Sequence, residues 1–88
     1  MKKDYLEIIE NGLLLVDFSR LQIIISKLIR EFRKQELIEV LEALNRRHTQ
    51  IYAKNLILSE EERFEVEVIM SLVEIINEKT KEIPKEIT

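Results

Sequence analysis

The chain has 88 residues, of which 45% are hydrophobic and 35% are charged, and its formal net charge is −3. This length allows one domain with a modest core, and the apolar content is too high for a disordered segment. The absence of cysteine excludes disulfides, thiolate metal ligands and cysteine nucleophiles, and the negative net charge argues against a general nucleic-acid-binding protein.

The turn-forming residues of the chain favour helices over strands. There is one Gly and one Pro, whereas an all-β protein uses both residue types at many turns. We therefore expect an all-α fold, a compact and mostly antiparallel bundle of three to four helices. The expected helices span about 3–11, 17–33, 35–57 and 59–82, within one domain of residues 1–83 that precedes a short tail at 84–88.

The first expected helix ends at an Asn11-Gly12 pair. Leu6 and Ile9 share one face and Glu7 shares another with Glu10, which is helical spacing. We expect Gly12 to lie just past this helix in the left-handed conformation that ends many helices. Because Asn-Gly between apolar runs is also a hairpin signal, a β-hairpin at this position is the alternative.

The middle of the chain contains two apolar stripes that are out of phase. We expect the second helix to begin with Asp17 or Ser19 as its cap. If the helix continued through RKQE (33–36), the later stripe would point roughly opposite to the earlier one. This reversal predicts a turn or kink at 33–36, and one long helix with different neighbours at its two ends is the alternative. The stripes are Leu21, Ile24, Ile25, Leu28, Ile29 and Phe32, and then Leu37, Ile38, Leu41, Leu44, Ile51 and Tyr52.

The last expected helix has the clearest boundaries. Ser59 and Glu62 form a capping-box pattern, and Pro84 stops the helix. The local alternation in FEVEV (64–68) is typical of a strand and is the weaker signal here. The expected core stripe is Phe64, Val68, Leu72, Ile75 and Ile76.

The sequence contains few residues that could support catalysis or bind a metal. His48 is the only histidine and projects into the middle of the stripe that contains Leu44 and Ile51, so we expect it to pack at the edge of the core. Without a second His or a Cys, the usual zinc sites cannot form within one chain, and a single Gly cannot build a phosphate loop. We expect no enzyme activity, no metal and no cofactor. Glu65 projects into the apolar arc of its helix, where it either leans into solvent or pairs with His48 or an Arg.

Apolar residues exceed what a core-facing stripe requires. Nine of the thirteen residues of LLLVDFSRLQIII (13–25) are large and apolar, whereas a surface helix needs an apolar arc only about 100° wide. The last helix has a similar surplus. We expect these residues to form an interface with a protein partner or in a homo-oligomer, and burial around a central helix is the alternative explanation. The interface residues are Leu14, Val16, Ile23, Val66, Met70 and Val73.

Charge is unevenly distributed, with a net charge of +4 over residues 20–54 and acidic segments on both sides. The basic residues Arg20, Lys27, Arg30 and Lys34 share one projected helix face. This face suits contacts with phosphate groups or with an acidic partner, but a solvated face with local ion pairs to Glu31 is the favoured explanation.

These patterns predict a small non-enzymatic interaction module, such as an accessory subunit or a regulatory binding protein. A nucleic-acid-associated regulator that uses the basic face is the alternative. The longest apolar run has four residues, far fewer than a membrane helix needs, so we expect a cytoplasmic protein with no membrane contact. Abundant Ile, Leu, Glu and Lys resemble the composition of thermophile proteins.

Overall fold

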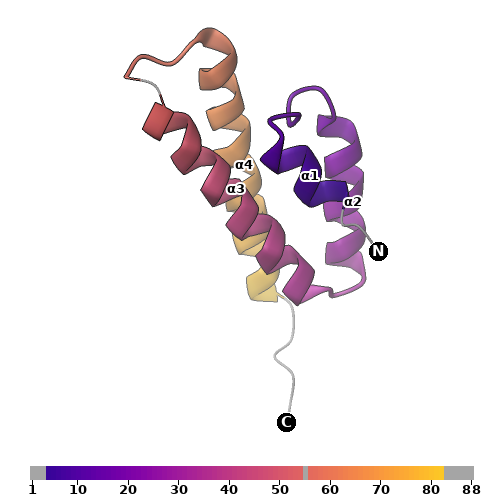
Figure 1. Ribbon diagram of the computed structural model, residues 1–88. Helices are drawn as coiled ribbons and strands as arrows, with labels where there is room; N and C mark the ends of the chain where they lie inside the picture. Colours follow the sequence, from indigo (N-terminus) through magenta and orange to yellow (C-terminus); the bar gives the residue numbers. More distant parts are fainter. Residues whose placement is uncertain (1–3, 55, 83–88) are drawn as a thin grey trace.

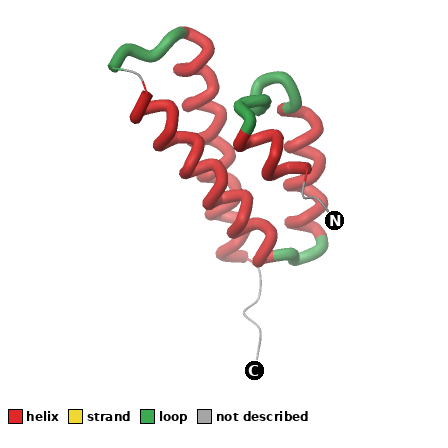
Figure 2. Tube along the Cα trace, in the orientation of Figure 1, coloured by secondary structure: helices red, strands yellow, loops and turns green. Residues whose placement is uncertain are grey.

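Four helices form the fold of the computed structural model, which describes residues 4–54 and 56–82. They are α1 (Asp4–Glu10), α2 (Phe18–Arg30), α3 (Lys34–Lys54) and α4 (Glu60–Glu82) (Figure 1). Figure 2 shows only helices and connecting loops in these ranges, which confirms the expected all-α bundle. The alternatives of a strand at 64–68 and a hairpin at Asn11-Gly12 are wrong, because neither segment forms a strand. The predicted tail at 84–88, which begins at Pro84, lies outside the described residues.

Helix α3 lies at the centre of the arrangement. It packs against α1, α2 and α4, and its direction is opposite to that of both α2 and α4 (Figure 1). Helices α2 and α4 each rest on α3 and contact each other far less closely. The bundle is therefore open along the line where α2 and α4 approach each other.

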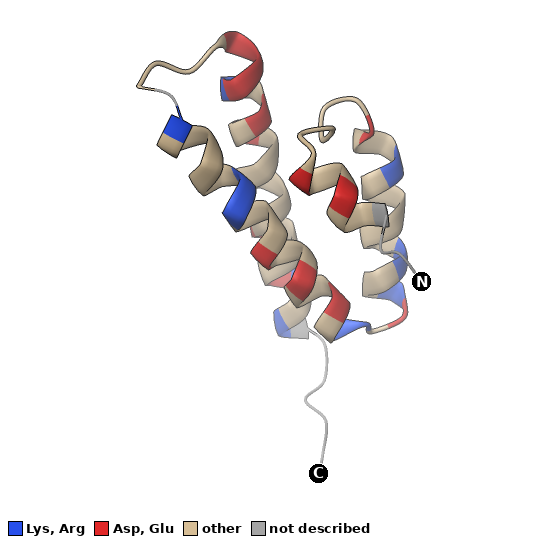
Figure 3. Ribbon diagram, viewed as in Figure 1, with Lys and Arg blue, Asp and Glu red and all other residues tan. Residues whose placement is uncertain are grey.

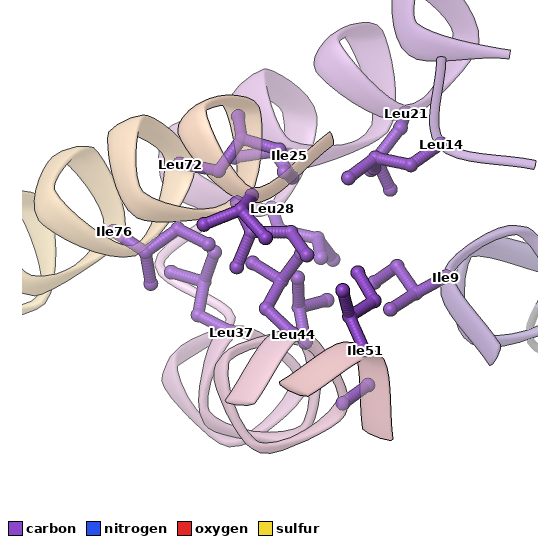
Figure 4. Packing of buried hydrophobic residues seen from close by; sticks show 14 residues of the cluster. Ile9, Leu14, Leu21, Ile25, Leu28, Leu37, Leu44, Ile51, Leu72 and Ile76 are labelled. Atoms are coloured by element: carbon purple, nitrogen blue, oxygen red, sulfur yellow. The ribbon is translucent and has the colours of Figure 1, made fainter. Parts of the chain in front are cut away.

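The core consists of aliphatic side chains from all four helices and from the α1–α2 loop. Figure 4 shows Leu14 of this loop beside Leu21, and Ile9 of α1 beside Ile51 of α3. Burial of each large side chain contributes about 1.5–3 kcal/mol. The apolar surplus of residues 13–25 is thus explained partly by internal burial. The buried core residues are Ile9, Leu14, Leu21, Ile25, Leu28, Leu37, Val40, Ala43, Leu44, Ile51, Val66, Ile69, Leu72 and Ile76.

Helix α1 ends as expected at Gly12, which has a φ of 71°. The backbone N–H of Gly12 donates to the carbonyl of Ile9 at 3.2 Å, and that of Leu13 donates to Ile8 at 2.9 Å. These two bonds define a Schellman motif, in which a residue in left-handed conformation satisfies the last carbonyls of a helix. The prediction for Gly12 is confirmed.

The turn between α2 and α3 has the same hydrogen-bond pattern without a glycine. The N–H of Phe32 donates to Ile29 at 3.1 Å, and the N–H of Arg33 donates to Leu28 at 2.9 Å, while Phe32 has a φ of 56°. The predicted chain break is confirmed, although it lies at 31–33 rather than 33–36. Phe32 was expected in the core stripe but is 65% exposed, because the left-handed turn directs it away from α2.

Replacing Phe32 by Gly is expected to raise the free energy of unfolding by about 1 kcal/mol. A left-handed conformation costs an ordinary residue roughly 1–2 kcal/mol, part of which the greater freedom of glycine in the unfolded chain offsets. Urea unfolding followed by circular dichroism measures the change. Phe32→Ala is the matched control, since it removes the exposed ring but keeps the backbone cost. Equal stability of the two variants would contradict the assignment.

The starts of α2 and α4 differ in how well the sequence predicted them. The N–H of Ser59 donates to Oε1 of Glu62 at 2.9 Å, and the N–H of Glu62 donates to Oγ of Ser59 at 3.2 Å. This reciprocal pair confirms the capping box. Asp17 occupies the N-cap position of α2, but its side chain makes no capping hydrogen bond.

Candidate functional site

The buried face of α4 differs from the predicted one. Among the expected stripe residues, Leu72 and Ile76 lie in the core, whereas Phe64 is 59% exposed and Ile75 is 46% exposed. The buried row instead consists of Glu65, Ile69, Leu72 and Ile76, and it runs along one side of the helix. The prediction fails for Phe64 and Ile75 because α4 packs mainly against α3, which leaves its neighbouring side uncovered.

That uncovered side of α4 forms one wall of an apolar groove, and α2 forms the other. The groove has a volume of about 260 Å³. Its position follows from the fold, because α2 and α4 each pack on α3 and leave a gap above it. The lining residues are Phe18 and Gln22 of α2 with Phe64, Glu67, Val68, Ser71, Leu72 and Ile75 of α4.

The α4 border of this groove is acidic. On α4, the exposed residues Glu67, Glu74 and Glu78 project to one side of the Phe64–Ile75 row. On α2, Lys27 is exposed but projects to the side of the helix opposite Phe18 and Gln22, away from the groove. Figure 3 shows Lys and Arg along α2, and Asp and Glu along the N-terminal part of α4. The groove therefore has an acidic border on α4, whereas the described residues that line it on α2, Phe18 and Gln22, are uncharged.

The predicted interface residues divide into two groups. Leu14 and Val66 are buried within the chain, and Val73 is half-buried against the core, so the expectation that they form an exposed face is wrong. These residues are buried because α3 covers a wider part of α4 than the helical projection implied. The loop before α2 also covers more of the core than the projection implied. Val16, Ile23 and Met70 are exposed, but they do not line the groove between α2 and α4.

The predicted basic face is shorter than the sequence suggested. Arg20, Lys27 and Arg30 are exposed on α2. Lys34 follows the turn at Phe32 and begins α3, so its seven-residue spacing from Lys27 no longer places it on the same helix face. The correction follows from the chain break, since projection along a helix holds only within one continuous helix.

Glu65 lies in the core and is paired with Arg47. Nε of Arg47 donates to Oε2 of Glu65 at 2.7 Å, and its Nη2 donates to Oε1 at 3.2 Å. The Glu65 side chain is 7% exposed, which shows that the alternative of a buried carboxylate paired with an Arg is correct and that leaning into solvent is wrong. The hydrogen bond that Arg47 donates to Glu65 raises the pKa of the Arg47 guanidinium, which therefore stays protonated.

Arg47 also contacts the α1–α2 loop. A Cβ atom added at Gly12 would lie 2.8 Å from Nη2 of Arg47 and 3.2 Å from its Cζ. The guanidinium thus occupies the space that a side chain at Gly12 would need. Arg47 connects the end of α1, the middle of α3 and the first turns of α4, so we assign the Arg47–Glu65 pair a structural role.

The lone histidine has the packing role expected for it. His48 is half-buried on α3, and its ring lies over Tyr52, with ring centroids 4.9 Å apart and a tilt of 47°. Within residues 4–54 and 56–82, no three His, Cys, Asp or Glu side chains are grouped so that they could hold a metal ion. The half-buried position and the ring contact with Tyr52 place His48 at the edge of the core.

A second hollow lies on the outer surface of α3 and has a volume of about 490 Å³. Although it is larger than the groove, the residues of the described part of the chain that line it all belong to α3. Its lining residues are Glu42, Asn45, Arg46, Thr49 and Gln50. We therefore take the α2–α4 groove as the candidate functional site.

The groove residues were present in the sequence analysis, but in another role. Phe64, Val68 and Ile75 were assigned to the core because they are apolar and share one side of α4. The signal that could have separated them was Glu65, whose position in the same arc indicated that the true core row was shifted.

Among the described helices, none combines the length and the apolar character that crossing a membrane requires. Comparisons of the chain with protein-family models, with curated proteins and with solved structures found no match.

Proposed function

We propose that this chain is a small non-enzymatic interaction module that binds a protein surface in the groove between α2 and α4. The observation that supports the proposal is the apolar groove itself, in which Phe64 and Ile75 are large, apolar and about half-exposed. Their spacing along α4, with Val68 between them, produces a continuous apolar row. Grooves of this kind receive an amphipathic helix through a few apolar anchors.

The expected affinity depends on a small number of these side chains. Complete burial of one such residue contributes about 1.5–3 kcal/mol, and a few central residues dominate most protein interfaces. Charged residues at the border contribute less to affinity and more to the choice of partner. A partner that covers Phe64 and Ile75 would therefore gain most of its binding free energy there.

A nucleic-acid-associated function is the second candidate, and it is based on the exposed basic residues of α2. The two functions differ in their response to salt, because phosphate binding weakens steeply as salt rises whereas an apolar interface does not. Glu31 follows Arg30 directly and opposes phosphate binding at that end of α2. The apolar groove therefore favours the protein-binding proposal.

A photo-crosslinking residue at position 75 tests the protein-binding proposal in cells that express the chain naturally. We expect Ile75 to give crosslinks to protein, because it lines the groove and is 46% exposed. Gln50 is the matched control, since it is also exposed on a helix but lies on the polar surface of α3. Crosslinks to nucleic acid at Ile75, or equal protein crosslinks at both positions, would contradict the proposal.

A further inference from the structure

We infer that the occupant of the groove is a basic amphipathic helix of another protein, whose apolar side packs in the groove and whose Lys or Arg residues pair with Glu67 and Glu74 of α4. This inference rests on the proposed function, since it gives the chemistry of the partner that binds the same groove. It depends on the spacing of the α4 residues that line the groove, on the charges beside them, and on the uncharged wall that α2 provides.

The lining residues of α4 repeat along the helix like the seam of a coiled coil. Spacings of four, three and four residues separate them, which is the a/d spacing that receives the side chains of a second helix. At about 1.5 Å of rise per residue, the row is roughly 16 Å long and matches about three turns of a partner helix. The residues of this row are Phe64, Val68, Ser71 and Ile75.

Carboxylates flank this seam on its outer side. Glu67 and Glu74 each directly precede an apolar residue of the seam, at the position whose charge selects the partner in coiled coils. Both are exposed, and neither forms an ion pair within the described part of the chain. Glu78 lies one turn after Glu74 and places a like charge beside it, which is unfavourable. Lys or Arg residues of a partner would neutralise these carboxylates, whereas an acidic helix or a phosphate backbone would be repelled.

The opposite wall of the groove makes the expected charge pattern one-sided. Phe18 and Gln22 line the groove on α2, and neither is charged. Lys27 projects to the other side of α2. The partner helix therefore needs cations only on the side that faces α4, and uncharged residues suffice on the side that faces Gln22.

A second copy of this chain would supply the cations but not the apolar side. Arg20, Lys27 and Arg30 are exposed on α2. Ile23 is the only exposed large apolar residue of α2, all of whose residues the structure describes. One apolar residue does not form the row that the groove would receive, so the observations favour a helix from a different protein.

Two synthetic peptides of about 14 residues test the charge preference, each stapled on its polar face because free helices of this length are marginal in water. Both carry Leu at the a and d positions of two heptads. One carries Lys beside the seam on one side, and the other carries Glu there. In NMR titrations of the full chain, we expect the Lys peptide to shift the amide resonances of Val68, Ser71 and Ile75. We also expect it to bind roughly 10-fold more tightly than the Glu peptide.

A matched pair of charge reversals tests the local pairing. Glu67→Lys is expected to weaken binding of the Lys peptide roughly 5-fold, because an attraction becomes a repulsion. Glu42→Lys changes the net charge by the same amount on the exposed outer surface of α3, away from the groove. It is expected to leave binding unchanged, which separates local pairing from a general attraction to an acidic protein.

A second pair of substitutions tests the apolar contact without a change in charge. Ile75→Ala is expected to weaken binding of the Lys peptide roughly 10-fold, because it removes an apolar anchor from the groove. Met70→Ala is the control, since Met70 is 53% exposed on the same helix but does not line the groove. It is expected to leave binding unchanged, and circular dichroism checks that all variants stay folded.

Equal affinity of the two peptides, or no binding of the Lys peptide at millimolar concentration, would overturn the inference. So would equal effects of Glu67→Lys and Glu42→Lys. If Ile75 crosslinks in cells to a protein segment that is not basic, or to a second copy of this chain, the proposed function survives and only the inferred partner is wrong. If Ile75 crosslinks to no protein, the proposed function fails and this inference fails with it.

Discussion

Replacing Arg47 by Met is expected to lower the free energy of unfolding by about 3 kcal/mol. The substitution leaves the carboxylate of Glu65 buried in the core without its two hydrogen bonds, and loss of one partner of a buried ion pair typically costs about 3–5 kcal/mol. The lower end of this range applies, because Arg47 is still 21% exposed. Small domains have a total stability of roughly 5–15 kcal/mol, so the change removes a large fraction of it.

Urea unfolding at one fixed protein concentration measures this loss, because any association would make the apparent stability depend on concentration. The control is the double substitution Arg47→Met with Glu65→Leu, which removes both charges and fills the space with apolar groups. Such replacements of a whole buried pair are often neutral or stabilising. If the double variant is as unstable as Arg47→Met alone, the unpaired carboxylate is not the cause.

A change of pH around neutrality does not remove the charge of Arg47, so it cannot replace the Arg47→Met substitution as a test. Because the hydrogen bond that Arg47 donates to Glu65 raises the pKa of Arg47, the stability that the Arg47 charge contributes is fully present below the ordinary pKa of arginine. That contribution is lost only as pH rises through the raised value, at strongly alkaline pH. Arginine at this position thus provides an ion pair whose cationic partner does not titrate in the physiological range.

Local signals in the sequence predicted helix ends well, because neighbouring residues determine them. Ser59 and Glu62 cap each other three residues apart, and Gly12 ends α1 with bonds to its own last turn. The break between α2 and α3 was also predicted, from the reversed phase of the apolar residues. The left-handed conformation of Phe32 at this break was not predicted, because phenylalanine has no intrinsic preference for that conformation.

The candidate site was harder to predict because it depends on tertiary packing. A projection of α4 assigns Phe64 and Ile75 to the core, since it counts apolar residues and treats Glu65 as an exception. In the structure, Glu65 belongs to the buried row because Arg47, 18 residues earlier, supplies its partner. The groove exists because α2 and α4 both pack on α3, and no local pattern encodes that spacing.

Replacement of Gly12 is expected to affect both the α1–α2 loop and the Arg47–Glu65 ion pair. Gly12→Ala is expected to lower the free energy of unfolding by about 2–3 kcal/mol, through two separate costs. The left-handed conformation costs alanine roughly 1–2 kcal/mol. The new Cβ would also lie 2.8 Å from Nη2 of Arg47, so the guanidinium must shift from its position on Glu65.

A double-mutant cycle separates these two costs. In the background of Arg47→Met with Glu65→Leu, the guanidinium is absent, so Gly12→Ala should cost only the backbone term of about 1–2 kcal/mol. Gly12→Asn is the second comparison, because asparagine tolerates the left-handed conformation but still carries a Cβ atom. It should be costly beside Arg47 and nearly neutral in the other background, as measured by urea unfolding. If the cost of Gly12→Ala is the same in both backgrounds, the contact between Arg47 and Gly12 does not limit the loop, and backbone conformation alone explains the glycine.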